Sequence, residues 1–376
     1  MTPQILHVFS SFAVGGVQVR FARLAAHFGA AYRHAIVAMD GNYACESRLD
    51  PALEIVYPAV TFTKGSTVAN IRALRGYLRS SRPDLMVTSN WGTIEWAAAN
   101  LPRVVPHIHI EDGFGPEEQN RQLRRRVWMR RMFLRRATVV VPSLTLRGIA
   151  TRTWRLPAGR VKYIPNGVDC AGFTPRPRIE SEPLIIGTVA ALRPEKNLPR
   201  LLWAFRRVAL QQTARLVIVG DGPERAKLEL LAADLGLADV VEFAGHTGSP
   251  EAHYRTFDIF ALSSDTEQMP LSVIEAMAAG LPVAATDVGD IAEMVGAENR
   301  RFVTGLQHNA LAAALQMLAA DPALRHRIGA ENREKALKLY SQDDMFWAYA
   351  RLFDSAMAPR MARAETALPS AVVGNV

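Results

Sequence analysis

The sequence contains little cysteine and no long apolar run. Its two cysteines, Cys45 and Cys170, are too few for a disulfide framework or a zinc cluster, which indicates a reducing compartment. No apolar run reaches the roughly 20 residues of a membrane-spanning helix. The first residues, MTPQILHVFSSFAVGG, lack the basic region and the small-residue cleavage site of a signal peptide. We therefore expect a cytoplasmic protein without a membrane span.

Acidic residues are fewer than basic ones: the chain has 36 Asp and Glu and 44 Lys and Arg, which gives a formal net charge of +8. This excess favours an anionic partner and leaves nucleic acid, anionic lipid and phosphorylated substrates open. Hydrophobic residues make up 49% of the chain and charged residues 21%, which is typical of globular proteins. Because 376 residues are many for a single core, we expect two domains.

Short apolar runs alternate with helical patterns along the whole chain, which is typical of parallel sheets covered by helices. The expected strands are residues 4–10, 34–40, 84–90, 104–110 and 138–143, then 183–190, 214–220, 240–245, 257–263 and 282–286. The predicted fold class is α/β, with two doubly wound Rossmann-like domains facing each other across a cleft. Ligands of such sheets bind beside the carboxyl ends of the strands.

A segment rich in proline, glycine and charge separates the two halves. We expect an N-terminal domain over residues 1–170, a linker over 171–182 and a C-terminal domain over 183–340. The last residues, 359–376, show little periodicity and are expected to be disordered.

Glycines follow two of the expected strands and precede helices. Gly15 and Gly16 would let backbone amides approach an anion at a helix start, and Gly220 and Gly222 would permit a tight turn. A simple strand-to-helix turn would have the same appearance. The dinucleotide fingerprint G-x-G-x-x-G is absent, which counts against a dehydrogenase.

The segment SSDTEQMPLSVIEAMAAG carries two carboxylates, Glu267 and Glu275, in apolar surroundings. No Lys or Arg stands three or four residues from Glu275 to pair with it. A helix beginning after Pro270 would leave the amides of Leu271 and Ser272 free to hold a diphosphate. The two glutamates would then accept hydrogen bonds from sugar hydroxyls. Alternatively, Glu275 caps the amides of a neighbouring loop.

Lys196 stands at the start of an expected helix, where the helix dipole disfavours a cation unless an anion binds beside it. A solvated lysine is the alternative. No D-x-D motif or histidine cluster indicates a metal site. Lys196, Arg193 and helix amides could bind phosphate charge without a metal or another cofactor.

These motifs resemble those of retaining GT-B glycosyltransferases, and most closely family 4 (glycosyltransferase group 1). The E-x7-E element, LRPEKN, VIVGDGPER and VEFAGH follow the order and spacing of that family, and the resemblance covers residues 4–355. It implies that the C-terminal domain binds a nucleotide-diphosphate sugar and that the N-terminal domain binds the acceptor. It also implies a final helix, residues 341–358, that crosses back to the N-terminal domain, and retention of anomeric configuration.

The resemblance implies roles for individual residues. Lys196 would neutralise the diphosphate, Glu267 would contact the donor sugar and Glu275 would hold the ribose hydroxyls. Gly245 and His246 would lie near the base. The implied catalytic residues are Asp112, Glu267 and Lys196. The implied donor-binding residues are Gly15, Gly16, Arg193, Lys196, Gly245, His246, Glu267, Met269, Pro270, Leu271, Ser272 and Glu275.

Several positions depart from the family pattern, among them Ala191, Gln268, Asp290 and Asp112. The arginine that often precedes the lysine motif is Ala191 here, and Arg193 stands two residues further on. Related enzymes have EHG where this chain has EDG, so Asp112 replaces a histidine close to the reacting sugar. Asp accepts hydrogen bonds but cannot donate them at neutral pH, so we interpret Asp112 as a substrate ligand. His109 would point to the opposite face of a continuing strand.

The segment RQLRRRVWMRRMFLRR, residues 121–136, has eight arginines and no acidic residue. Read as a helix, Leu123, Val127 and Leu134 share one side, which Arg130 interrupts. The arginines either belong to a packed helix, where they are solvated or pair with acids elsewhere, or they bind an anionic surface. Nucleic acid is disfavoured because no recognition motif accompanies the run. We predict peripheral binding to the inner face of the cytoplasmic membrane, with a lipid-linked or polysaccharide acceptor.

Two other functions fit part of this pattern. A nucleotide-sugar epimerase of the same layout would turn over its substrate without an acceptor, and the E-x7-E element speaks against it. A non-catalytic protein that binds sugar nucleotides is favoured if Asp112 and Ala191 mark a lost activity.

Overall fold

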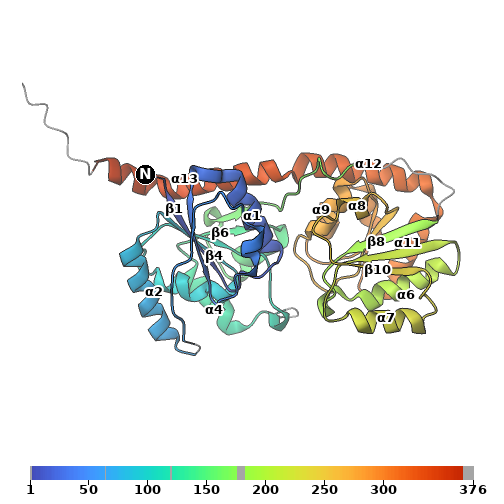
Figure 1. Cartoon of the computed structure of the whole chain (residues 1–376), viewed down its shortest axis with the longest axis horizontal. Helices are drawn as coiled ribbons and strands as arrows, with labels where there is room; N and C mark the ends of the chain where they lie inside the picture. The colour runs from blue at the N-terminus through green and yellow to red at the C-terminus, as the bar shows by residue number, and fades with distance from the viewer. Residues whose placement is uncertain (1, 64, 119–120, 176–182, 367–376) are drawn as a thin grey trace, which may run out of the picture. The chain divides into compact units, whose positions relative to one another are not determined.

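The computed structural model describes residues 2–366 apart from residues 64, 119–120 and 176–182. These residues form two compact units (Figure 1). Unit 1 comprises the described residues up to Ile164 and those from Phe346 onward, and unit 2 comprises those from Pro165 to Met345. Most of the linker expected at 171–182, and the end of the tail expected to be disordered, lie outside the described residues.

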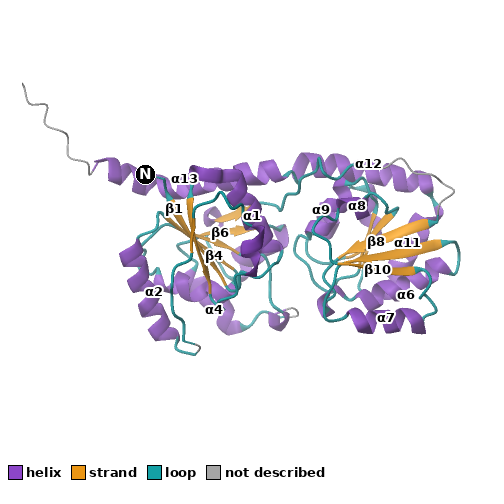
Figure 2. Ribbon diagram, viewed as in Figure 1, coloured by secondary structure: helices purple, strands orange, loops and turns teal. Residues whose placement is uncertain are grey.

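Unit 1 is built on a seven-stranded parallel sheet in the order β3-β2-β1-β4-β5-β6-β7 (Figure 2). The strands are β1 Gln4–Phe9, β2 Arg33–Ala38, β3 Ile55–Val56, β4 Leu85–Ser89, β5 His107–Ile110, β6 Thr138–Val141 and β7 Val161–Tyr163. The α-helices are α1 Gly16–Phe28, α2 Thr67–Ser81, α3 Ile94–Ala99, α4 Arg124–Phe133, α5 Leu144–Gly148 and α13 Gln342–Thr366. All five expected strands are confirmed. The edge strands β3 and β7 were not predicted, because runs this short carry no readable periodicity.

Unit 2 repeats this plan with a six-stranded parallel sheet in the order β10-β9-β8-β11-β12-β13. Its strands are β8 Leu184–Val189, β9 Ala214–Val219, β10 Val241–Gly245, β11 Ile259–Leu262, β12 Val283–Thr286 and β13 Val303–Thr304. Its α-helices are α6 Leu198–Ala209, α7 Arg225–Asp234, α8 Glu251–Tyr254, α9 Leu271–Ala278, α10 Ile291–Met294, α11 His308–Ala320 and α12 Pro322–Leu339. Two α/β units with doubly wound parallel sheets confirm the predicted fold class.

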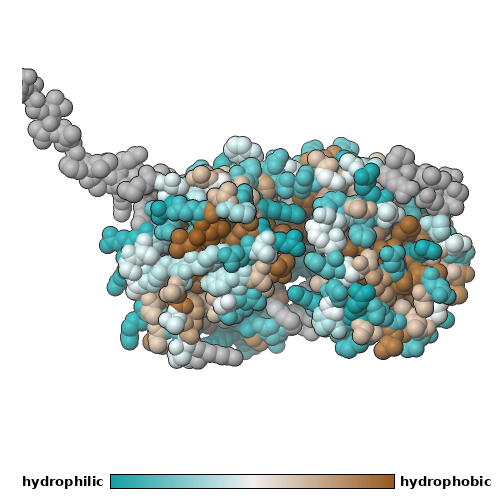
Figure 3. All heavy atoms as spheres, viewed as in Figure 1, coloured by the Kyte–Doolittle hydropathy of each residue, from teal (hydrophilic) through white to brown (hydrophobic). Residues whose placement is uncertain are grey.

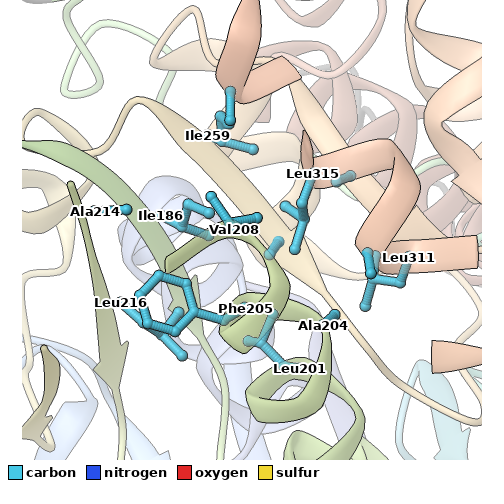
Figure 4. Close-up of a cluster of buried hydrophobic side chains, with 14 of the residues drawn as sticks. Ile186, Leu201, Ala204, Phe205, Val208, Ala214, Leu216, Ile259, Leu311 and Leu315 are labelled. Carbon is cyan, nitrogen blue, oxygen red and sulfur yellow. The ribbon is translucent and has the colours of Figure 1, made fainter. Parts of the chain in front are cut away.

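The strands of unit 2 are apolar runs because both faces of their sheet are covered. Along β9, Leu216 and Ile218 pack into one buried cluster, whereas Val217 and Val219 pack into the cluster on the opposite face. Figure 4 shows the first cluster, in which Phe205 of α6 and the leucines of α11 meet the strands. The surface that faces the viewer in Figure 3 mixes hydrophilic and hydrophobic residues in both units.

Helix α13 carries the end of the chain back to unit 1, whose boundary it enters at Phe346. Phe346 lies against His27, and Phe353 lies against Phe28 and Tyr32 of the same unit. The helix runs to Thr366, further than residue 358, where we expected it to end.

Candidate functional site

The predicted site residues lie at strand ends, in the loops that follow strands, or in the helices to which those loops lead. Because every strand pair is parallel, these loops gather at the carboxyl edge of each sheet. In unit 2 the strand order reverses between β8 and β11, and the loops after these two strands carry Lys196 and Glu267. Doubly wound sheets bind ligands at such a point, so the topology marks this edge as a binding site.

Lys196 and Glu267, which are 71 residues apart in the sequence, form an ion pair. The distance from Lys196 Nζ to Glu267 Oε1 is 2.5 Å, and the two side chains are 23% and 11% exposed. The hydroxyl of Ser264 donates to the same Glu267 oxygen at 2.8 Å. A lysine ammonium has three donors, so the pair leaves N–H groups of Lys196 available to a ligand.

The two loops that hold this pair are joined by further hydrogen bonds. Asn197 adopts a left-handed conformation, φ 41°, and its side-chain amide contacts both carboxylate oxygens of Asp265 at 3.1 Å. Arg200 pairs with Asp265 at 2.7 Å and donates to the carbonyl of Ser263 at 2.6 Å. The loops that carry Lys196 and Glu267 are therefore held together by neighbouring residues that were not among the predicted site residues.

A glycine on the next loop packs directly against the Glu267 loop. Gly289 has φ +61°, and a Cβ there would stand 2.6 Å from the carbonyl oxygens of Glu267 and Gln268. The amide of Asp290 donates to the Gln268 carbonyl at 3.0 Å. Only glycine allows this approach without displacing the backbone that presents Glu267.

Glu275 accepts a hydrogen bond from the hydroxyl of Tyr254 at 2.8 Å. Tyr254 is fully buried, and burial together with the Glu275 charge raises the pKa of its phenol, so the phenol stays a donor. The same hydroxyl contacts the carbonyl of Ser272 at 3.1 Å. Tyr254 was missed by sequence reasoning, because nothing in the pattern around it distinguishes it from a core aromatic residue.

The residues at the start of α9 have two environments. Leu271 and Ser272 occupy its first turn, where helix amides have no intrahelical acceptor, and Pro270 precedes the helix. Met269 is buried at 4% exposure, its side chain belongs to the core, and its carbonyl accepts from Asn166 at 2.9 Å. The predicted contribution of Met269 to donor binding therefore has no support from its side chain.

The remaining predicted residues of unit 2 lie at neighbouring strand ends. Gly245 ends β10 with φ +76°, and His246 follows it with an exposed side chain. Arg193 is exposed and has no side-chain partner among the described residues. Gly222 has φ +159°, and a Cβ there would stand 2.5 Å from the Leu192 carbonyl, while a Cβ on Gly220 would clash with the Ala190 carbonyl. These glycines let the β9 loop pass the loop that leads to Lys196.

In unit 1, Asp112 follows β5 and is paired with Arg20 of α1. Both guanidinium NH groups of Arg20 donate to its carboxylate, at 2.6 and 2.8 Å. Burial opposes the charge of Arg20, but the neighbouring Asp112 raises the pKa of the guanidinium above its usual value. The amide of Asp112 donates to the Asn90 side chain at 2.8 Å. Asp112 is therefore a fixed carboxylate, 12% exposed, that a cation already neutralises.

Gly15 and Gly16 begin α1, the helix that carries Arg20. Gly15 is extended, with φ −166° and ψ 167°, so its conformation does not require glycine. A Cβ on Gly16 would meet no atom within 4 Å. At Gly15, by contrast, a Cβ would stand 2.9 Å from Gln18 Oε1. Helix α1 follows β1, where the strand order of the unit 1 sheet reverses.

His109 is buried beneath this site. Its Nδ1 lies 2.8 Å from the hydroxyl of Thr88, which also lies 2.8 Å from Nε2 of His107. Its Nε2 lies 3.7 Å from Glu111 Oε2. His109 is therefore held in the interior, whereas Asp112 lies beyond the end of β5 at Ile110.

Arg130 of α4 is buried in a cage of acids and aromatic rings. It contacts Glu111 at 3.2 Å and Glu118 at 3.1 Å, and its guanidinium lies 4.9 Å from the centre of the Trp154 ring. Arg126 contacts Glu118 at 3.2 Å. Arg130 is 0% exposed, so the expectation that it meets a membrane is wrong. Its pairing with acids follows the alternative interpretation of the arginine-rich segment.

The opposite face of α4 is exposed. Trp128 and Met132 are 59% and 40% exposed, and Leu123 just before the helix is 45% exposed. A groove of about 470 Å³ follows this face. Its lining residues are Arg121, Gln122, Arg124, Val127, Trp128, Arg131 and Thr153. Neither Arg124 nor Arg131 has an ion pair with a described residue.

The described residues contain neither a metal-binding cluster nor a membrane-spanning helix. No group of three or more His, Cys, Asp and Glu side chains there is arranged to hold a metal ion. None of the helices within those residues is both long enough and apolar enough to cross a membrane.

Two family models match the chain. The model described as "Glycosyltransferase Family 4" matches residues 14–171, and that described as "Glycosyl transferases group 1" matches residues 173–335. The models meet between residues 171 and 173, a short distance after unit 2 begins at Pro165.

The curated relatives match this chain over only part of their own length. The GDP-mannose-dependent alpha-(1-6)-phosphatidylinositol monomannoside mannosyltransferase of Mycobacterium tuberculosis is 32% identical over 199 residues, 47% of this chain and 51% of that protein. The MMP alpha-(1->4)-mannosyltransferase of Mycolicibacterium hassiacum is 28% identical over 204 residues, 53% of this chain and 49% of that protein. The chain thus spans about half the length of these relatives.

Solved structures share the fold over nearly the whole chain. The Anabaena HepE protein in complex with UDP has a TM-score of 0.78 and 19% identity, covering 94% of this chain and 100% of that one. A glycosyltransferase from Rickettsia africae has a TM-score of 0.77 and 15% identity, covering 95% of this chain and 99% of that one. At these identities the likeness concerns the fold.

Proposed function

Because the chain belongs to the group 1 glycosyltransferases of the GT-B fold, we propose that it transfers a sugar from a nucleotide-diphosphate donor to a saccharide or lipid-linked acceptor. The observation that carries the proposal is the ion pair of Lys196 and Glu267 at the switch point of the unit 2 sheet. A cation and a carboxylate at one strand edge match the two ends of such a donor, its phosphates and its hydroxyls.

The donor lies over the carboxyl edge of unit 2. Lys196 binds the diphosphate with the N–H groups that Glu267 leaves free, and the amides of Leu271 and Ser272 contact the same group. Glu275, oriented by Tyr254, accepts from the ribose hydroxyls. Glu267 accepts from the transferred sugar.

The reaction breaks the bond between the anomeric carbon and the diphosphate oxygen and forms a bond to an acceptor hydroxyl. Lys196 and the helix amides stabilise the negative charge that grows on the leaving phosphate. That phosphate takes the proton of the attacking hydroxyl, and attack from the same face retains the anomeric configuration. The charge is balanced by protein groups alone, without a metal.

The acceptor is bound by unit 1, and the exposed face of α4 brings the protein to the inner face of the cytoplasmic membrane. Trp128 and Met132 project from this face, and Arg124, Arg125 and Arg131 surround them. Aromatic and aliphatic side chains enter the headgroup region, and each nearby basic residue adds about 1 kcal/mol on anionic lipid. This arrangement fits an acceptor that is itself anchored in lipid.

Sedimentation with anionic vesicles tests the membrane proposal. Replacing Arg124, Arg125 and Arg131 with Gln should abolish binding at low salt. The control replaces Arg206, Arg207 and Arg215, exposed arginines of unit 2, with Gln and has the same change in net charge. If the wild type stays in the supernatant at low salt, or the control loses as much binding, the membrane proposal fails.

Protection against heat tests the donor proposal. A panel that includes UDP-glucose, GDP-mannose and UDP-N-acetylglucosamine should contain at least one compound that raises the melting temperature. The protecting compound should be consumed only when an acceptor is present. Isomerisation without an acceptor would instead identify an epimerase, and no consumption with any acceptor would identify a binding protein.

A further inference from the structure

A second groove in unit 1, between α5, β7 and α13, has no lining residue in α4 or among the residues assigned to the donor. Its volume is about 620 Å³, which falls in the range of small-molecule sites. The lining residues are Arg147, Ala158, Val161, Lys162, Tyr163, Ile164, Ala348, Arg351, Leu352 and Ser355.

Three cations from three separate elements meet at this groove. Arg147 comes from α5, Lys162 from the edge strand β7 and Arg351 from α13. All three side chains are exposed, and none has an ion pair with a described residue. The described residues that line the groove include no acidic side chain.

Within the described part of the chain, the cations of the groove lack the carboxylate partners that Arg200 and Arg20 have. Near the donor site Arg200 is paired with Asp265, and near Asp112 the guanidinium of Arg20 is paired bidentately. Those two charges are balanced from within the chain. In the groove, three like charges around one concave surface repel one another, and an anion from solution would relieve that repulsion.

We propose that this groove binds the phosphate groups of a small molecule that carries a di- or triphosphate. Two or three negative charges match the three cations, and guanidinium groups bind phosphate oxygens in pairs. Tyr163 and Ser355 add hydroxyl groups to the lining. Val161 and Ile164, 3% and 7% exposed, form an apolar floor that holds no competing charge.

The groove is next to both segments through which unit 1 is joined to the rest of the chain. Ile164 is the last residue of unit 1 before the chain enters unit 2, and Arg351 follows shortly after the return at Phe346. A phosphate chain that contacts Lys162 and Arg351 therefore ties β7 to α13. Binding there slows opening of the backbone in these two segments.

A membrane surface is disfavoured by the shape of the lining. The large apolar residues of the groove are buried or half-buried, whereas Trp128 and Met132 project from α4. Trp347, which is 62% exposed, precedes Arg351 by one helical turn but does not line the groove. Vesicle binding is therefore included in the test as the competing outcome.

Calorimetry with tripolyphosphate tests the proposal. All proteins carry Lys196→Ala, which weakens phosphate binding at the donor site. In this background tripolyphosphate should bind one site in unit 1, with an affinity that falls as salt is raised. Adding Arg147→Gln and Arg351→Gln should weaken binding at least about tenfold, because two charge-assisted contacts are lost. Adding Arg206→Gln and Arg207→Gln, with the same change in charge, should leave binding unchanged.

Hydrogen exchange gives an independent readout. Tripolyphosphate should slow amide exchange at residues 161–164 and 348–355 in the Lys196→Ala protein and not in the protein that also lacks Arg147 and Arg351. Three results would overturn the proposal. The first is no tripolyphosphate binding at low salt, and the second is an equal loss of binding in the Arg206 and Arg207 control. The third is that the Arg147 and Arg351 exchanges abolish binding to anionic vesicles while tripolyphosphate does not compete with the vesicles. None of these results bears on sugar transfer, so the proposed function is tested separately.

Discussion

Replacing Arg130 with Met should destabilise unit 1 more than any other exchange on α4. Methionine keeps the length of the side chain and removes its charge. The guanidinium of Arg130 is fully buried and contacts Glu111 and Glu118, which are 0% and 2% exposed. One Glu111 oxygen, Oε1, already has no hydrogen-bond partner among the described residues. Glu111 would therefore keep a buried charge with no cation beside it.

The expected loss is about 3–5 kcal/mol of unfolding free energy, the usual cost of breaking a buried ion pair by removing one partner. Arg126 and the amide of Leu123 still contact Glu118, which keeps the loss within that range. The attraction between the Arg130 cation and the rings of Trp91 and Trp154 is part of this figure and is not added to it. Because a domain is stable by only about 5–15 kcal/mol, the loss should be conspicuous.

Urea unfolding followed by tryptophan fluorescence measures this loss, since Trp91 and Trp154 surround the guanidinium. Arg131→Met is the matched control, because the neighbouring side chain is exposed and should change stability by less than about 0.5 kcal/mol. The variant that combines Arg130→Met with Glu111→Gln and Glu118→Gln should regain much of the loss, since it contains no unpaired charge. A loss below about 1 kcal/mol for Arg130→Met alone would refute the reasoning.

Three further predictions concern other groups. Tyr254→Phe removes one hydrogen bond to Glu275 and should weaken donor binding by about 0.5–1.5 kcal/mol in calorimetry; unchanged affinity would show that the phenol does not orient the carboxylate. Burial lowers the pKa of His107 to about 3 and that of His34 to about 4, from 6.5. Unfolded imidazoles take up protons below 6.5, so urea unfolding should show full stability above that pH and a decline as pH falls towards 4; constant stability over this window would contradict the burial. Lys196→Ala should lower turnover at saturating donor while leaving the melting temperature nearly unchanged, and a wild-type rate would show that the lysine does not act on the leaving phosphate.

The amino-acid pattern indicated candidate site residues but not the partners that hold them. Lys196 and Glu267 were identified from local motifs, but their ion pair depends on the adjacency of β8 and β11, which no local pattern encodes. Tyr254 gave no signal, because its hydroxyl distinguishes it from other core aromatic residues only once Glu275 lies beside it.

Two buried arginines did leave a signal in the sequence. Arg20 lies three residues after Val17 and one before Phe21, on the apolar face of α1, where a solvated side chain is not expected. Arg130 interrupts the apolar side of α4 in the same way. An arginine on the buried side of an amphipathic helix indicates a carboxylate partner inside the fold, and Asp112 and Glu118 are those partners here.

Donor binding by Glu275→Gln tests the central claim most directly. Calorimetry would use the nucleotide sugar that best protects the wild type against heat, with Glu334→Gln, an exposed change on α12, as the control. Glu275→Gln should weaken binding by about 1.5–3 kcal/mol, since the ribose hydroxyls lose a charged acceptor. The control should bind like the wild type. Wild-type affinity in a folded Glu275→Gln protein would contradict the placement of the donor at the carboxyl edge of unit 2.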